Sequence, residues 1–148
     1  PLLRISDKVL AGFLYSKIVR SPSYVKTEVE VKSLEIISGI SEHHLIEIVG
    51  TLVDNAYEAC TEELNQVMME LDSEDDRLVF IIKNQINDIR MKNIDRFFEK
   101  GYSTKSGDRK HGLGLYNAKM LIKKYQGDIF VSTENINEKR YICMRVVV

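Results

Sequence analysis

The stretch Leu52-Val53-Asp54-Asn55-Ala56-Tyr57-Glu58-Ala59 is the most informative part of the chain. It lies in a segment whose apolar residues recur every three or four positions. Ser41 is a suitable N-cap for that segment, so the pattern predicts a helix from Ser41 to Cys60. Asparagine is a mediocre helix former. The place of Asn55 in the middle of this apolar segment therefore needs a tertiary reason.

Asn55 belongs to a polar stripe along the predicted helix, formed with Glu47 and Thr51 at i, i+4 spacing and with Glu58 three residues further on. One interpretation is a solvated polar edge. The other is that the Asn55 carboxamide oxygen coordinates Mg²⁺, a hard cation that keeps several waters and takes further oxygens from phosphates. Asp54 would then have a structural hydrogen-bonding role.

A second motif, Gly112-Leu113-Gly114-Leu115, follows a basic segment with Lys105 and Arg109 and opens a predicted helix over residues 113–125. Glycines let the backbone approach an anion closely, and a helix start offers free N–H groups and partial positive charge to a phosphate. Alone, a Gly-x-Gly before a helix is often only a turn. Together with Asn55 it predicts a nucleotide site in which one half holds Mg²⁺ and the other wraps phosphates.

Hydrophobic periodicity divides the chain into helices and strands. Helices are predicted over residues 7–20, 41–60, 91–98 and 113–125, and strands over residues 25–31, 66–71, 78–83, 128–133 and 140–148. An acidic turn is predicted over residues 72–76, and Gly127 suits a left-handed helix cap. This order predicts a single α+β domain, a two-layer sandwich with helices on one face of a mixed, largely antiparallel sheet.

The composition is that of an ordinary globular domain. The chain has 148 residues, of which 44% are apolar and 29% charged, and its net charge is −1 with scattered basic residues. This length is one domain's worth, and the charge pattern argues against a nucleic-acid or membrane surface. Cys60 and Cys143 lack metal-binding spacing, so buried thiols in a reducing compartment are expected. No signal peptide or apolar run of membrane-spanning length is found.

These motifs resemble the GHKL superfamily, the ATP-binding fold shared by sensor histidine kinases, gyrase, Hsp90 and MutL. The helix containing Asn55 resembles its N-box, with Asn55 at the Mg²⁺-coordinating position. Phe97-Phe98 resembles the F-box, residues 99–111 the ATP lid, and Gly112–Leu115 the G2 box. The resemblance covers nearly the whole chain and implies the Bergerat fold, with ATP and Mg²⁺ as cofactors.

Within this superfamily, residues 54–59 together with residues 98–105 are similar to Agr-type quorum-sensing kinases. Residues 98–105 are also similar to citrate-type sensor kinases. The resemblance implies that Lys105 and Arg109 contact phosphates, as do the amides of Gly112–Leu115. Tyr102 is the lid aromatic that would cover the base.

Two positions depart from the family pattern. The G1 box is Asp-x-Gly-x-Gly, whereas this chain has Asn84-Gln85-Ile86-Asn87-Asp88, with Asn84 at the adenine-binding Asp position and no glycines. An amide oxygen can accept the adenine amino hydrogen, without the charge that would strengthen the bond. The Agr-type branch shares a degenerate G1 box. Glu58 stands where the family has Lys, Arg or His.

The residue at the general-base position favours kinase over ATPase chemistry. ATP-hydrolysing relatives place a Glu one helical turn before the Mg²⁺ asparagine, and this chain has Thr51 there. Glu47 is about 12 Å from Asn55 along the helix axis. It would therefore orient the polar stripe and would not reach a water molecule that attacks the phosphate beside Asn55. A histidine acceptor is itself a nucleophile that mainly needs positioning. The predicted catalytic residues are therefore Asn55, Lys105 and Glu47.

The resemblance thus implies a histidine-kinase catalytic domain alone over residues 1–148, because His43, His44 and His111 are in the wrong context to accept a phosphoryl group. Its partners would be a separate dimerisation and phosphoacceptor domain and, through that domain, a response regulator, with no nucleic acid and no direct membrane contact. It would be the cytoplasmic domain of a membrane-anchored bacterial receptor kinase. A pseudokinase or interaction module, a GHKL ATPase and an unrelated α+β domain are the alternatives.

Overall fold

The structure, a computed structural model, describes residues 8–33, 35, 38–87 and 109–148, with only the backbone for residues 109–113. Its described strands form a five-stranded sheet in the order β1-β2-β3-β5-β4. β1 and β2 pair in parallel, and the other neighbours are antiparallel. The bounds are β1 Lys26–Val31, β2 Gln66–Glu74, β3 Arg77–Gln85, β4 Asp128–Ile136 and β5 Lys139–Val147.

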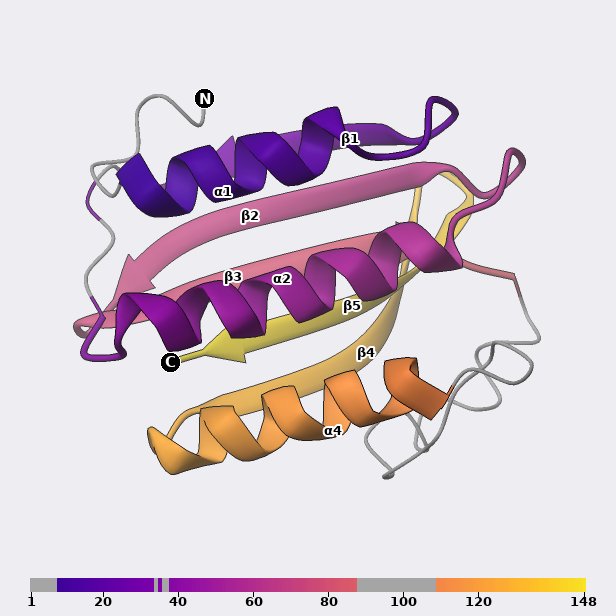
Figure 1. The fold of residues 1–148 in the computed structure, drawn as a ribbon. Coiled ribbons are helices and arrows are strands. Elements are labelled where there is room, and N and C mark those ends of the chain that lie inside the picture. Colours follow the sequence, from indigo (N-terminus) through magenta and orange to yellow (C-terminus); the bar gives the residue numbers. More distant parts are fainter. Residues whose placement is uncertain (1–7, 34, 36–37, 88–108) are drawn as a thin grey trace.

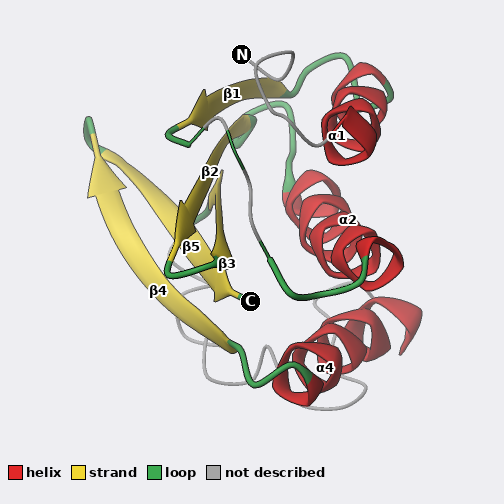
Figure 2. Cartoon of the chain, turned by 90° about the vertical axis from the view of Figure 1, so that its left-hand side faces the viewer, coloured by secondary structure: helices red, strands yellow, loops and turns green. Residues whose placement is uncertain are grey.

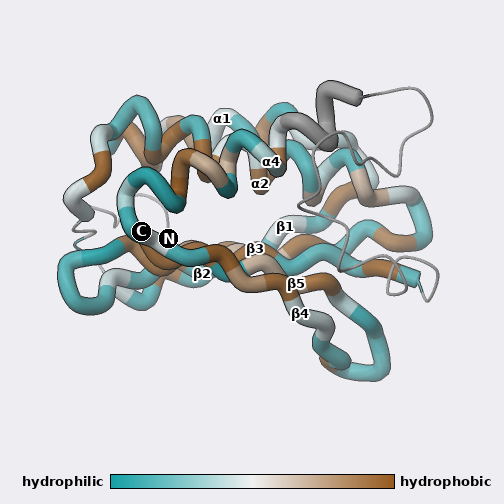
Figure 3. Tube along the Cα trace, turned by 90° about the horizontal axis from the view of Figure 1, so that it is seen from below, coloured by the Kyte–Doolittle hydropathy of each residue, from teal (hydrophilic) through white to brown (hydrophobic). Residues whose placement is uncertain are grey.

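The described helices all cover the same face of this sheet (Figures 1 and 2). They are α1 Lys8–Val19, α2 Glu42–Ala59 and α4 Arg109–Lys124. Seen edge-on in Figure 3, the helices form one layer and the strands the other, and the hairpin end of β4 and β5 bends away from the helices. The predicted two-layer α+β sandwich with a mixed, largely antiparallel sheet is therefore confirmed. Among the described residues, no helix has the length and apolar character needed to cross a membrane.

The core lies between the two layers. On β3, Leu78, Phe80 and Ile82 alternate along the strand and are at most 2% exposed, because one face of a strand takes every second side chain. They belong to the same buried cluster as Leu52 of α2 and Ile122 of α4. The helices are thus held to the sheet mainly by apolar burial.

α2 begins where its cap predicts. Ser41 has an extended backbone and its hydroxyl accepts a hydrogen bond from the His44 amide. The helix ends before Cys60, whose backbone N–H donates to the Tyr57 carbonyl. Cys60 and Cys143 are both buried and free, as predicted. Burial, and next the negative charge of Glu134, raise the pKa of the Cys143 thiol above its usual value.

The turn between β2 and β3 is tighter than predicted. The strands continue through most of the expected acidic turn, and only Asp75 and Asp76 remain as the connection. Both have positive φ, 52° and 61°, a combination that fits the twist of a two-residue hairpin. Antiparallel pairing with β3 extends β2 to Glu74 in spite of its polar residues.

The end of α4 also differs from the prediction. Gln126, not Gly127, has the left-handed backbone, with φ of 60°. The Gly127 amide donates to the Ile122 carbonyl and closes the helix end. A Cβ at Gly127 would lie 2.5 Å from the Val147 carbonyl oxygen. The glycine is therefore required where the connection between α4 and β4 passes close to the end of β5. The predicted helix over residues 91–98 lies outside the described residues.

Candidate functional site

The two motifs that suggested a nucleotide site lie on neighbouring, antiparallel helices. At one end, the His44 ring on α2 hydrogen-bonds to the Tyr125 hydroxyl just beyond α4. Further along, Thr51 of α2 faces Gly114 of α4, and a Cβ at Gly114 would lie 3.5 Å from the Thr51 methyl carbon. α2 and α4 therefore run in opposite directions, and the C-terminal half of α2 lies beside the N-terminal half of α4 (Figure 1).

Asn55 lies one helical turn beyond Thr51 on the same side of α2. Four residues advance a helix by about 6 Å, and the same step back from Gly114 along α4 reaches Lys110. Asn55 is therefore level with the first turn of α4 and is half-buried. The polar stripe on α2 and the start of α4 meet at one end of the helix layer.

The start of α4 is four residues earlier than predicted. The helix begins at Arg109, so Gly112, which was predicted to precede the helix, lies with Gly114 within its first two turns. The free amide groups of the helix start consequently belong to residues 109–112. This correction keeps the partial positive charge at the end of α4 that lies beside Asn55. The predicted lid residues Tyr102 and Lys105 lie outside the described residues.

Asn84 occupies the same end of the molecule from the sheet side. It follows Phe80 and Ile82 at two-residue spacing and therefore faces the helices, and it pairs with Val67 of β2 and Ile142 of β5. Asn84 is 4% exposed, and among the described residues its Nδ2 has no hydrogen-bond partner. Leaving such a donor unpaired costs about 1–3 kcal/mol. Sequence reasoning chose this position but could not reveal the unpaired donor.

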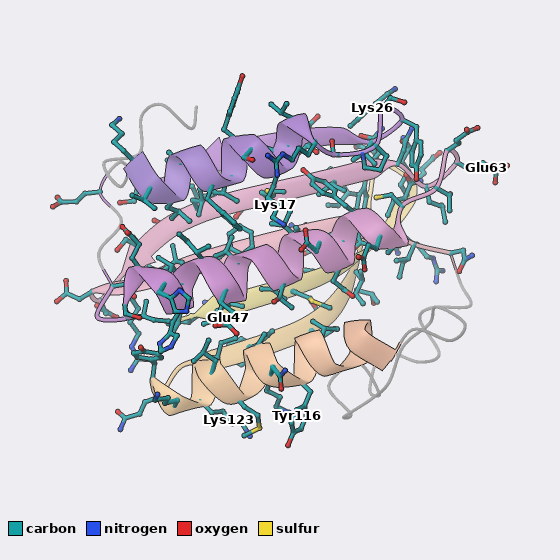
Figure 4. The ribbon with its side chains drawn as sticks, in the orientation of Figure 1. Lys17, Lys26, Glu47, Glu63, Tyr116 and Lys123 are labelled. Carbon is teal, nitrogen blue, oxygen red and sulfur yellow. The ribbon has the colours of Figure 1, made fainter. Side chains whose placement is uncertain are left out.

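The other polar residues of α2 near Asn55 are Glu47, Thr51 and Asp54. The Thr51 hydroxyl donates to the Glu47 carbonyl at 2.9 Å, and the Glu47 side chain is exposed on the α4 side of the helix (Figure 4). Asp54 accepts a 2.7 Å hydrogen bond from Lys17 of α1. The structural role predicted for Asp54 is confirmed, because this ion pair ties α1 to α2.

A groove of 410 Å³ lies between α1 and α2, on the side of α2 away from α4. Phe13, Pro22 and Tyr57 form its apolar part, and Lys17, Arg20, Asp54 and Glu58 lie around them. Glu58 therefore takes part in this groove. The sequence showed no signal for it, because its walls come from helices that are distant along the chain.

A divalent cation at Asn55 would rely on few protein ligands. The described part of the chain contains no group of three or more His, Cys, Asp or Glu residues that could hold a metal. A carboxamide oxygen beside the positive end of α4 fits a cation that is bound jointly with an anionic ligand, since Mg²⁺ is often held by few protein oxygens plus phosphates. The donor set at this end of the helices therefore fits Mg²⁺ together with a polyphosphate.

Comparison with known proteins finds a family that matches most of the chain. Residues 40–146 match the family of histidine kinase-, DNA gyrase B-, and HSP90-like ATPases. The chain is 30% identical over 137 residues to a probable C4-dicarboxylate sensor kinase of Halalkalibacterium halodurans, which covers 88% of this chain and 26% of that protein. It is 31% identical over 135 residues to the sensor histidine kinase DcuS of Escherichia coli, with 88% and 24% covered. The chain thus spans about a quarter of the length of these curated relatives.

The fold is also found in solved structures. A mycobacterial sensor histidine kinase, MprB, superposes with a TM-score of 0.72 at 20% identity, covering 95% of this chain and 91% of that chain. The nucleotide-free catalytic domain of histidine kinase ThkA gives a TM-score of 0.68 at 17% identity, with the same coverage. A further relative, from Klebsiella pneumoniae, is the sensor histidine kinase CitA, 29% identical over 139 residues, with 84% of this chain and 24% of that protein covered. The similarity to peptide-sensing kinases stays a prediction.

Proposed function

Because this chain belongs to the histidine kinase-, DNA gyrase B-, and HSP90-like ATPase family and has the fold of histidine-kinase catalytic domains, we propose that it binds Mg-ATP and donates the γ-phosphate to a histidine on a separate dimerisation domain. The close approach of α4 to α2, where a Cβ at Gly114 would lie 3.5 Å from the Thr51 methyl carbon, is the main support for this proposal. It puts the asparagine of one motif and the helix start of the other at one end of the molecule, where a single triphosphate can reach both.

Each part of the site has a distinct role in this proposal. The Asn55 carboxamide oxygen would hold Mg²⁺, which neutralises phosphate charge when it is bound. The backbone amides at the start of α4 would hold the phosphates, with Arg109 and Lys105 as flanking cations. Phosphoryl transfer has a loose transition state, so alignment and charge neutralisation are most of what it needs. Glu47 would orient the other side chains of the polar stripe.

Thr51 supports transfer to an acceptor over hydrolysis. Its hydroxyl is engaged with the Glu47 carbonyl, and a hydroxyl is a poor general base for activating water. A histidine acceptor brings its own nucleophile and needs positioning. The relatives of this chain are named as sensor kinases. We propose that the chain is the cytoplasmic part of a membrane-anchored receptor kinase that signals to a response regulator.

Isothermal titration with ATP, in Mg²⁺ and again in EDTA, tests the proposal. We expect saturable binding in Mg²⁺ and a large loss of affinity in EDTA, because phosphate charge would then lack its counter-ion. A folded sample that binds no nucleotide at millimolar concentration would instead be a pseudokinase. Phosphate release without any histidine partner would identify an ATPase.

Gly114→Ala should separate nucleotide binding from folding. The added methyl group meets Thr51 at an ordinary contact distance, and alanine favours a helix over glycine by up to about 1 kcal/mol. We therefore expect an unchanged or slightly higher unfolding midpoint in urea. ATP affinity should fall about tenfold, because the methyl group fills space between the helices that the phosphates approach. Gly12→Ala, on the exposed face of α1 where a Cβ meets nothing within 4 Å, is the matched control.

A further inference from the structure

α1 is apolar on its outer face as well as on the face that packs on the core. Leu10 and Leu14 are completely buried. Val9, Tyr15 and Val19, in contrast, are 48%, 65% and 63% exposed, and they are three of the five large apolar side chains that are exposed in the described part of the chain. A helix that is apolar around its whole circumference is normally covered on all sides. The outer face of α1 therefore has the character of a contact surface.

This outer face contains a row of residues at helical spacing. We call the row the α1 seam, and its members, at intervals of three, four and three positions, are Val9, Gly12, Ser16 and Val19. A Cβ at Gly12 would meet nothing within 4 Å, so the backbone of a partner has room to approach closely there. The seam is about 15 Å long, which matches three turns of a second helix packed against it.

The groove between α1 and α2 borders the seam, and Ser16 belongs to both. In the apolar part of this groove, Tyr57 presents its ring, because its hydroxyl is engaged at 3.0 Å with the hydroxyl of Thr27. On the rim, Lys17 and Asp54 neutralise each other across 2.7 Å. The groove therefore fits an uncharged apolar side chain, of the kind that anchors a protein partner in a pocket.

Charge indicates which kind of partner fits the seam. Residues 8–27 contain four basic residues and no acidic one, and Arg20 is exposed just beyond Val19. A second copy of α1 would bring like charges together. An anionic membrane would meet Asp54 and Glu58 on the groove rim, next to the seam. The charges therefore favour a protein helix that carries acidic residues beside its apolar side chains.

We propose that a helix of the dimerisation domain lies along the α1 seam, with an apolar side chain in the groove and acidic side chains near Arg20. The inference rests on the proposed function, because it assumes that this domain brings the acceptor histidine. The ion pair between Lys17 and Asp54 puts the C-terminal end of the seam beside the residue that precedes Asn55. A domain held on the seam is thus kept at the end of the molecule proposed to bind the triphosphate, and positioning is what a histidine acceptor mainly needs.

The test uses the kinase that contains this chain together with its dimerisation domain. Gly12→Leu fills the open space on the seam, so we expect phosphoryl transfer to the histidine at saturating ATP to fall about tenfold or more, with ATP affinity unchanged. The fold should persist, because position 12 is exposed and leucine favours a helix over glycine. Lys123→Leu adds an exposed leucine to α4, at the other edge of the helix layer, and should transfer at the unmodified rate (Figure 4).

Val19→Glu and Val19→Lys test the charge of the partner. Both substitutions remove the same apolar side chain from the seam, so the loss of apolar contact affects both variants. We expect the glutamate variant to transfer about tenfold more slowly than the lysine variant at low salt, because acidic side chains of the partner repel it, and the difference should shrink as salt is added. Equal rates, or a faster glutamate variant, would contradict an acidic partner.

The outcomes separate the docking surface from the proposed function. Unchanged transfer in Gly12→Leu, in a protein that binds ATP, overturns the docking surface while the proposed function stands. If the isolated chain dimerises, or binds phosphatidylglycerol vesicles, and Gly12→Leu abolishes this, the seam belongs to a second copy or to a membrane and the inference is wrong. Failure of the unmodified kinase to bind ATP or to phosphorylate the histidine overturns the proposed function and this inference with it.

Discussion

Asn55→Ala is expected to abolish Mg²⁺-dependent ATP binding, lowering the affinity by about a hundredfold or more while the fold persists. The reason is that the described residues supply no alternative cluster of acidic, histidine or cysteine ligands. A cation that loses its protein oxygen loses the link between α2 and the phosphates, and about 2.7 kcal/mol corresponds to a hundredfold change. Alanine is also the better helix former, so α2 itself should not weaken.

The measurement is a calorimetric titration with ATP in Mg²⁺ and in EDTA. In EDTA, the Asn55→Ala variant and the unmodified chain should bind ATP with similarly low affinity, because the substitution acts through the cation. Asn117→Ala replaces an exposed asparagine on α4 and is the matched helical control. Retained Mg²⁺-dependent affinity in Asn55→Ala would show that the cation is held elsewhere.

Gly127→Ala is expected to lower the free energy of unfolding by about 2–3 kcal/mol, because the new methyl group overpacks a backbone contact. Its Cβ would lie 2.5 Å from the Val147 carbonyl oxygen and 3.2 Å from side-chain atoms of Ile122 and Val148. A carbonyl in the sheet cannot move away as the end of a flexible side chain can. The clash falls where α4 is connected to β4, so this connection must shift relative to β5.

Urea denaturation followed by circular dichroism measures this change. Gly12→Ala is the control of opposite sign, since nothing lies within 4 Å of its Cβ and it should stabilise α1 by about 0.5–1 kcal/mol. An unfolding free energy in Gly127→Ala equal to that of the unmodified chain would mean that the corner between α4 and β4 is looser than the structure shows.

Much of the fold followed from local pattern. The apolar period of α2 and its Ser41 cap predicted that helix within a residue at each end, because both signals are carried by neighbours in sequence. The strand ends were less predictable. β2 and β3 extend through polar residues because each is paired to its neighbour, and pairing depends on residues outside the local window.

The candidate site divides in a similar way. Residue chemistry and motif spacing were enough to choose Asn55 and the glycines near residue 114, since a ligand oxygen or a permissive backbone is a property of the residue itself. Asn84 and the family came from the resemblance of the motifs to known sequences. Their meeting at one end of the molecule depended on tertiary packing, and so did the α1–α2 ion pair and the close approach that needs Gly127. Such contacts join residues far apart along the chain, and one sequence read in order carries no signal of which distant side chains will touch.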